Sequence, residues 1–223
     1  MANREDIIQP FWKPPGWTSF DVVKKLRGFT GIRKVGHAGS LDPFAEGVLV
    51  VCFGLATKRV ATLMELEKEY QAQIKLGVTT DTLDPEGEVI DEQDVPGLTL
   101  ETLQGALSRF IGVILQVPPM YSALKVNGKR LYQLARQGIT VQRQAREVRI
   151  YDLELTGWQE PDRLDIRVVC GKGTYIRSLA ADLAAALGTV GHLLALTRTR
   201  VGPYGGDQAI RMDQLESWKF IEA

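Results

Sequence analysis

The chain has 223 residues, of which 44% are hydrophobic and 24% charged, the proportions of an ordinary globular protein with a substantial buried core. No apolar run approaches the roughly 20 residues that a membrane-spanning helix needs, and the first residues lack the apolar segment of a secretion signal. Twenty-seven basic residues balance 27 acidic ones, so the net charge is formally zero, which argues against a uniformly basic nucleic-acid-binding protein.

The charged residues are unevenly distributed along the chain. Seven basic residues and one acidic residue lie between positions 119 and 150, whereas positions 81–102 hold eight acidic residues and no basic one. Such polarisation is typical either of a phosphate-binding face on a neutral protein or of two solvated segments of opposite sign. The two cysteines, Cys52 and Cys170, lie in apolar runs without the spacing of metal ligands. They predict buried thiols in a reducing compartment, and therefore a cytoplasmic protein.

Short strands and helices alternate in the N-terminal half of the chain. Thr18 and Asp21 have the spacing of a capping box, which predicts a helix that ends near Gly28 or Gly31. The other elements expected in this half are a strand end at 11–17, a buried strand at 48–54, a helix at 56–66 with Val60, Leu63 and Met64 inward, and a strand at 68–77 with Tyr70, Ala72, Ile74 and Leu76 on one face.

The C-terminal half is expected to contain two well-marked helices. Thr99 is expected to cap a helix that runs through Phe110, and Thr174 to cap an alanine- and leucine-rich helix at 175–187. The acidic stretch at 79–87 predicts a turn-rich surface loop, because its carboxylate spacing departs from that of a calcium-binding loop. The other expected elements are a strand at 113–117, a basic lobe at 120–146 with a short helix that Gly138 ends, a hairpin of strands at 148–158 and 164–170, a strand at 192–201 and a last helix at 212–220.

The chain is organised around residues 36–47, with the sequence GHAGSLDPFAEG, and the apolar run that follows them. The glycines and the proline favour an ordered loop, and the run at 48–54 favours a buried strand. Asp42, fixed by Pro43 and five residues after His37, is either a chemical centre or a residue that starts a turn or caps a short helix.

Four stretches resemble motifs of one family. Residues 36–47 resemble the catalytic loop of the TruB family of tRNA pseudouridine synthases, in which the aspartate of a G-x-L-D-P motif is essential. The K-P-x-G motif at 13–16 with the helix after it, and G-T-Y-I-R at 173–177, resemble two further motifs of that family. Residues 118–125 resemble the beginning of its inserted RNA-binding loop.

The resemblance assigns roles to single residues. Asp42 would be the essential catalytic residue, which acts by attack on the sugar, by attack on the uracil ring or by removing a proton from the sugar. Arg177 would pair with Asp42 and keep it ionised. Tyr70 would stack on the uracil, and His37 would help to displace the target base. Two further residues match positions of the substrate pocket, namely Tyr175 and Leu196.

Without the resemblance, these residues have plainer interpretations. Tyr70 would be a core aromatic residue with a solvated hydroxyl, and Arg177 an ordinary solvated residue in the first turn of a helix. Lys13 and Arg198 would either hold the aspartate loop or be surface charges.

The resemblance implies an α/β (α+β) protein with a pseudouridine synthase fold. We expect one catalytic domain over residues 1–223, with a mixed, largely antiparallel sheet, flanking helices and a basic RNA-binding lobe inserted at about 119–147. The resemblance ends at about Val201, so no C-terminal PUA domain is expected.

The implied function is the isomerisation of uridine to pseudouridine in the T loop of tRNA, at position 55. The target base would be flipped out of the RNA, and no metal or other cofactor is expected. The expected partner is the T stem-loop of tRNA; we expect a cytoplasmic monomer with no membrane and no obligate protein partner. The alternatives are a guide-RNA-dependent synthase of the dyskerin type and a protein that binds and remodels tRNA with little catalysis.

Overall fold

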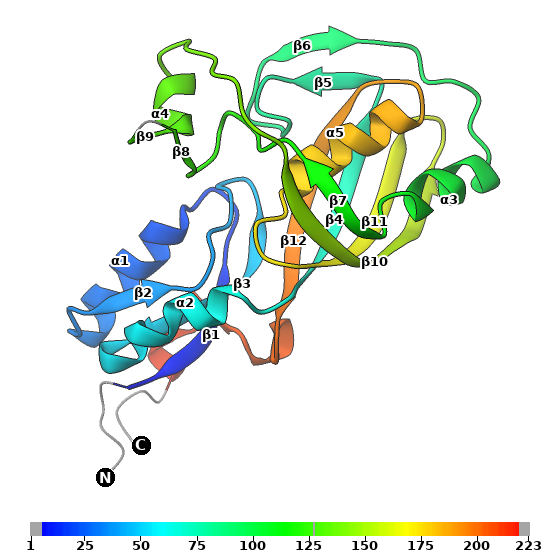
Figure 1. Ribbon diagram of the computed structural model, residues 1–223. Coiled ribbons are helices and arrows are strands. Elements are labelled where there is room, and N and C mark those ends of the chain that lie inside the picture. Colours follow the sequence, from blue (N-terminus) through cyan, green and yellow to red (C-terminus); the bar gives the residue numbers. More distant parts are fainter. Residues whose placement is uncertain (1–5, 127, 219–223) are drawn as a thin grey trace. The chain divides into compact units, whose positions relative to one another are not determined.

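The computed structural model describes residues 6–126 and 128–218. The chain divides into two compact units, formed by residues 1–71 with 196–223 and by residues 72–195. Strands β4 (Lys68–Leu76) and β12 (Gly191–Val201) contribute residues to both units (Figure 1). Among the described residues, no helix combines the length and the apolar character that crossing a membrane requires.

The first unit is organised around strand β3 (Glu46–Phe53), which is buried over almost its whole length. β3 pairs antiparallel with β1 (Ile8–Lys13) and β2 (Val35–His37), and parallel with β12 at Thr197 and Arg198. This confirms the buried strand that the apolar run predicts. Two short strands complete the sheet, namely β13 (Tyr204–Gly205) beside β12 and β14 (Ile210–Arg211) beside β1.

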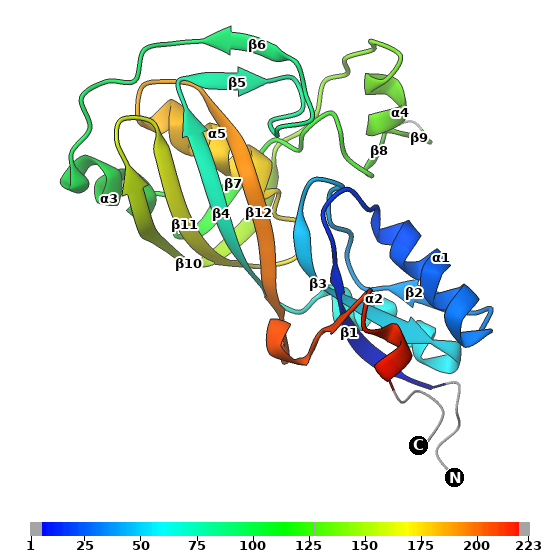
Figure 2. The same cartoon turned by 180° about the vertical axis from the view of Figure 1, so that it is seen from behind.

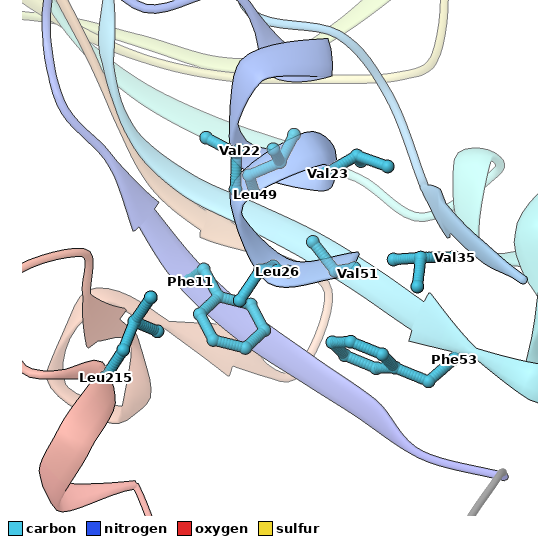
Figure 3. Close-up of a cluster of buried hydrophobic side chains, with 9 residues drawn as sticks. All are labelled: Phe11, Val22, Val23, Leu26, Val35, Leu49, Val51, Phe53 and Leu215. Carbon is cyan, nitrogen blue, oxygen red and sulfur yellow. The ribbon is translucent and has the colours of Figure 1, made fainter. Parts of the chain in front are cut away.

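Helix α1 (Ser19–Thr30) begins and ends where its sequence signals predict. Thr18 is the N-cap and forms a reciprocal capping box with Asp21, and Gly31 ends the helix with a φ of +72°. The apolar face of α1 packs against β1 and β3 (Figure 3). The cluster contains Phe11, Val22, Val23, Leu26, Val35, Leu49, Val51, Phe53 and Leu215.

The helix predicted at 56–66 is only partly correct. The segment forms a 3₁₀ helix, η1 (Gly54–Arg59), followed by a short α-helix, α2 (Val60–Met64). Leu63 is buried as expected, but Met64 is 44% exposed. The change from three to 3.6 residues per turn explains the error, because it shifts which side chains share the inner face.

The second unit contains the sheet order β12–β4–β11–β10–β7. β10 (Arg146–Gln159) pairs antiparallel with β11 (Arg163–Cys170), as the predicted hairpin requires, and with β7 (Gly112–Gln116). Helix α5 (Ile176–Ala186) lies across one face of these strands in both views (Figures 1 and 2). Helix α3 (Leu100–Ser108) begins at the expected cap, Thr99.

Shorter elements fill the connections of the second unit. The acidic segment forms a hairpin of β5 (Val78–Thr80) and β6 (Val89–Glu92). The turn-rich loop predicted at 79–87 is confirmed for residues 81–87, which connect these two strands; the strands themselves were not predicted. Between the paired strands β7 and β10, the basic segment forms a small hairpin and a helix. These elements are β8 (Lys125–Val126), β9 (Lys129–Arg130) and α4 (Leu131–Ala135), the last of which is the predicted short helix.

The predicted fold class is confirmed. The protein is mixed α/β, with a largely antiparallel mixed sheet and flanking helices. The alternation at 68–77 is correct, since alternate residues of β4 are buried. Cys52 and Cys170 are buried and form no disulfide, and burial raises the pKa of the Cys52 thiol to about 11.

The predicted cap of helix α5 is wrong. Thr174 donates its hydroxyl hydrogen bond to the carbonyl of Gly171, and Tyr175 occupies the N-cap position without a side-chain cap. The buried side chain of Gln116 binds both backbone groups of Tyr175, accepting from its N–H at 2.7 Å and donating to its carbonyl at 3.0 Å. A distant amide therefore satisfies the helix start in place of a local hydroxyl.

The last predicted helix, at 212–220, is also not observed within the described residues. Between Met212 and Trp218 the chain forms only a 3₁₀ turn, η3 (Leu215–Ser217), and positions 219–220 lie outside the description. Trp218 packs on Phe11 with ring centroids 5.0 Å apart. The extended backbone at Trp218 directs its ring toward Phe11. A helix continued through Trp218 would point the ring in another direction and remove this contact.

Gly47 is required where β3 meets β12. Its φ is +117°, and a Cβ there would lie 2.2 Å from the carbonyl oxygen of Arg198. We expect Gly47→Ala to lower the free energy of unfolding by at least about 2 kcal/mol, because the clash is with backbone atoms. Gly31→Ala is the control, since Gly31 also has a positive φ but open space around it; it should cost only about 1 kcal/mol. Equal losses in urea unfolding would show that the close approach does not matter.

Candidate active site

The loop that carries Asp42 connects β2 to β3 in the first unit. Its backbone is bound to α1, because the hydroxyl of Ser19 accepts from Leu41 N–H at 2.9 Å and donates to the carbonyl of Leu41 at 3.3 Å. Asp42 itself begins a turn, in which its carbonyl accepts from Ala45 N–H at 3.2 Å. Asp42 is thus the start of a turn, as one of the two interpretations predicts. The turn uses only its backbone, so the carboxylate of this half-buried residue can still have a chemical role.

Lys13 holds the C-terminal side of this loop. The residue is fully buried, and its ammonium donates to the carbonyls of Pro14 at 2.9 Å, Trp17 at 2.6 Å and Pro43 at 3.2 Å. The carbonyl of Pro43 also accepts from Gly16 N–H at 2.8 Å. The residue directly after Asp42 is therefore fixed to the K-P-x-G turn by a charge-assisted hydrogen bond.

Arg198 holds the N-terminal side of the loop. Only 1% of this residue is exposed, and its guanidinium donates to the carbonyls of Gly39 at 3.1 Å, Ser40 at 3.2 Å and Val48 at 2.7 Å. The three nitrogens of the planar guanidinium each donate to the carbonyl of a different residue. Lys13 and Arg198 therefore hold the aspartate loop and are not surface charges.

His37 ends strand β2 at the beginning of the same loop. Burial lowers the pKa of its imidazole, and the positive charge of Arg198 lowers it further. The imidazole is therefore neutral at neutral pH. Two other expected site residues of this unit, Tyr70 on β4 and Leu196 on β12, are buried, with 8% and 6% exposure.

Arg177 lies in the first turn of α5 in the second unit and is 3% exposed, so the solvated interpretation is wrong. Its guanidinium donates to the carbonyls of Thr82 at 2.8 Å and Tyr121 at 2.7 Å. It also lies 3.3 Å from the carboxylate of Asp84. Arg177 thus connects α5, the acidic hairpin and the beginning of the basic segment within this unit.

The acidic loop was expected to be solvated, but this is wrong at Asp84, which is buried. Its carboxylate is buried with Arg177 and also accepts from the Thr82 hydroxyl at 2.6 Å and from Glu86 N–H at 3.0 Å. A buried carboxylate with two hydrogen bonds and a guanidinium partner is an internal counterion. The loop is therefore part of the structure around Arg177.

The sequence did not reveal three residues that hold the site: Ser19, which binds Leu41 next to Asp42, Asp84, which pairs with Arg177, and Gln116, which binds Tyr175. Ser19 follows the capping residue Thr18 and belongs to no motif, so nothing in the sequence marks it as a partner of the loop. Gln116 lies near the end of an apolar run, which predicts a strand and no binding role. Leu83, directly before Asp84, has a φ of +61°, which is unusual for leucine. A sequence does not show this conformation, so it gave no indication that Asp84 is buried.

Two solved structures share the fold of this chain. A crystal structure of a Cbf5–Nop10–Gar1 complex matches with a TM-score of 0.75 and 30% identity over 97% of this chain and 55% of that one. A structure of an H/ACA RNP bound to a substrate RNA containing 2′-deoxyuridine matches with a TM-score of 0.70 and 26% identity over 97% of this chain and 54% of that one. This likeness and the aspartate loop define a pseudouridine synthase.

The chain belongs to the TruB family of pseudouridylate synthases. Residues 27–176 match the N-terminal domain model of that family, and residues 177–222 match the C-terminal domain model of tRNA pseudouridylate synthase B. The second match continues past Val201, where the sequence motifs end.

The curated relatives include bacterial enzymes. The chain is 50% identical over 209 residues to tRNA pseudouridine synthase B of Francisella philomiragia subsp. philomiragia, covering 93% of this chain and 69% of that protein. It is 49% identical to the enzyme of the same name from Francisella tularensis subsp. tularensis, covering 91% of this chain and 67% of that protein. The chain spans about two thirds of the length of these relatives.

Replacing Lys13 by methionine tests how the loop is held. Methionine keeps much of the volume but removes the donor for three carbonyls, so we expect Lys13→Met to lower the free energy of unfolding by about 2–4 kcal/mol. Hydrogen exchange should show the greatest loss of protection in residues 38–47. Uniform loss along the whole chain would contradict a specific role for Lys13 in the loop.

The lowered pKa of His37 makes stability depend on pH. The unfolded chain binds a proton at His37 more readily than the folded chain, so stability is complete above about pH 6.5 and falls as the pH drops through the range below it. His37→Gln should flatten this part of the stability curve. NMR titration of the two histidines, with the variant as assignment, would contradict the prediction if His37 titrated at or above pH 6.5.

Proposed function

We propose that this protein isomerises uridine to pseudouridine in tRNA, at position 55 of the T loop. The observation that carries the proposal is the 50% identity, over 93% of the chain, to a tRNA pseudouridine synthase B. The guide-RNA-dependent alternative is disfavoured, because identity to the Cbf5 complex is only 30%. We propose that it acts on tRNA in the cytoplasm, as a monomer.

The reaction breaks the bond between N1 of uracil and C1′ of ribose and forms a bond between C5 and C1′. The base gains a proton on N1 and loses one from C5, so the reaction needs no oxidant, reductant or second substrate. Asp42 supplies the carboxylate that acts as nucleophile or base. Lys13 and Arg198 bind the backbone on both sides of Asp42, which supports a fixed carboxylate that needs no rearrangement during the reaction.

The remaining site residues bind the flipped uridine in this proposal. Tyr70 stacks on the uracil and Leu196 supplies an apolar wall; both residues belong to the first unit, as Asp42 does. Neutral His37 displaces the target base from the RNA stack, a role that needs no charge. In this proposal Arg177, which already has Asp84 as a counterion, also pairs with Asp42, and Tyr175 contacts the substrate.

The basic segment at about 119–147 forms the RNA-binding lobe in this proposal. Tyr132 is flanked by the guanidinium groups of Arg130 and Arg136, 5.9 and 5.7 Å from its ring centroid. Cations around an aromatic ring suit a ligand that offers both phosphates and bases. The lobe therefore provides affinity for the T stem-loop, while the aspartate loop provides the chemistry.

Asp42→Asn tests the catalytic role, because it removes the charge of the side chain with little change in shape. Pseudouridine mapping in an unmodified tRNA transcript should show conversion of the T-loop uridine by the wild type and a loss of at least about 10³-fold in the variant. Asp213→Asn, an exposed carboxylate of the same unit, is the control and should convert at the wild-type rate.

Measuring tRNA binding by the Asp42→Asn protein distinguishes the proposed synthase from a protein that only remodels tRNA. Binding of tRNA close to that of the wild type, together with lost conversion, would support the assigned role. A wild-type protein that binds tRNA without converting any uridine would favour the remodelling alternative and contradict the proposed activity.

A further inference from the structure

A second basic surface lies along helix α1 in the first unit. A groove of about 730 Å³ follows the exposed side of this helix, and we call it the α1 groove. The helix buries Val22, Val23 and Leu26 on its other side. The groove is lined by Gly16, Trp17, Asp21, Lys24, Lys25, Gly28 and Phe29.

The charge of this region is strongly one-sided. Residues 22–41 contain no acidic residue and five basic ones, all of them exposed. Asp21, at one end of the groove, is engaged in the helix cap, where its carboxylate accepts from Thr18 N–H at 2.8 Å and from the Thr18 hydroxyl at 2.6 Å. The five basic residues are Lys24, Lys25, Arg27, Arg33 and Lys34.

Gly28 leaves part of this groove open at a cost to the helix. Glycine is a poor residue for a helix interior. Apart from the backbone of α1 and the residues on either side of Gly28, no atom lies within 4 Å of the position that a Cβ would occupy there, so packing does not require glycine. An empty position beside Lys24 and Lys25 lets a ligand approach the helix backbone closely.

The groove is also bound to the aspartate loop. The Trp17 carbonyl accepts from the Lys13 ammonium, which also binds the carbonyl of Pro43, and Gly16 N–H donates to the same Pro43 carbonyl. Two lining residues are therefore tied to the residue that follows Asp42. From this end α1 extends for 12 residues, about 18 Å. A strand with one phosphate per roughly 3.4 Å along a duplex would offer several phosphates over that length.

We propose that the α1 groove binds the RNA strand that flanks the target uridine. Lys24 and Lys25 contact phosphates, Gly28 leaves room for the sugar–phosphate backbone, and the half-buried Trp17 and the exposed Phe29 supply aromatic surface for a sugar or base. The inference rests on the proposed function, since it takes the RNA that presents its uridine to Asp42 as the ligand.

Gly28→Gln separates RNA binding from folding. Glutamine favours the helix over glycine, so the melting temperature should rise by about 2 °C. The side chain fills the groove, so affinity for an unmodified tRNA transcript should fall several-fold. Gly105→Gln in α3 is the matched control, because a Cβ there also meets nothing within 4 Å; it should stabilise without affecting tRNA affinity. A stabilised Gly28→Gln protein that binds tRNA like the wild type would overturn the inference, as would equal loss of affinity in both variants.

Reversing both lysines provides a second test. K24E/K25E should weaken tRNA binding by about tenfold or more near 0.1 M salt and reduce the salt dependence of binding, as expected for two lost phosphate contacts. Unchanged affinity and salt dependence would overturn the inference. If the wild type converts uridine while these variants bind normally, only the α1 groove is excluded. If the variants bind weakly but the wild type converts nothing, the groove is supported and the proposed activity fails.

Discussion

The first unit depends on two buried cations that bind the backbone of a single loop. Lys13 and Arg198 are 185 positions apart in the chain, yet their donors reach the carbonyls of residues 39–40 before Asp42 and of Pro43 after it. Removing a cation from water costs several kcal/mol unless other polar groups replace the water. Here the carbonyls of the loop are those groups, so the loop and the cations stabilise each other.

This arrangement explains how a segment without regular secondary structure can hold a reacting group in place. A strand satisfies its carbonyls in a ladder, whereas residues 38–45 satisfy several of theirs with the two charged side chains. Gly47 adds a steric condition, because only a residue without a Cβ allows β12 to bring Arg198 so close to β3. The position of Asp42 therefore depends on contacts from two distant parts of the chain, β1 and β12, and on the nearby Gly47.

The sequence predicted what local interactions determine. The capping box at Thr18, the helix cap at Thr99, the alternation of β4 and the hairpin of β10 and β11 all depend on residues close in sequence, and all are confirmed. The aspartate loop could be recognised because its motif is also local. The error at 56–66 is also local, since it comes from a 3₁₀ segment within the helix. Other errors arose where a distant partner decides the outcome, as at the start of α5, where Gln116 binds the backbone in place of Thr174.

Burial of charge was the least predictable feature of the site. Composition alone makes any single arginine or aspartate a surface residue, yet Arg177 and Asp84 are both almost fully buried. Their pairing became visible only when the fold brought α5 to the acidic hairpin within the second unit. For the same reason, the sequence could not decide whether Lys13 and Arg198 hold the aspartate loop or are surface charges. Nothing next to them in the sequence indicates which carbonyls they bind.

These buried charges also change how the formal net charge of zero should be interpreted. Lys13 and Arg198 contribute nothing to the surface, and Arg177 and Asp84 neutralise each other inside the second unit, so the exposed surface is not basic overall. Affinity for RNA then has to come from local segments. A local basic segment is sufficient for this, because salt screens the acidic residues elsewhere: at physiological salt, charges more than about 8 Å apart have little influence on each other. An uninterrupted basic stretch such as residues 22–41 can therefore attract phosphates even though the acidic stretch at 81–102 balances it in the total.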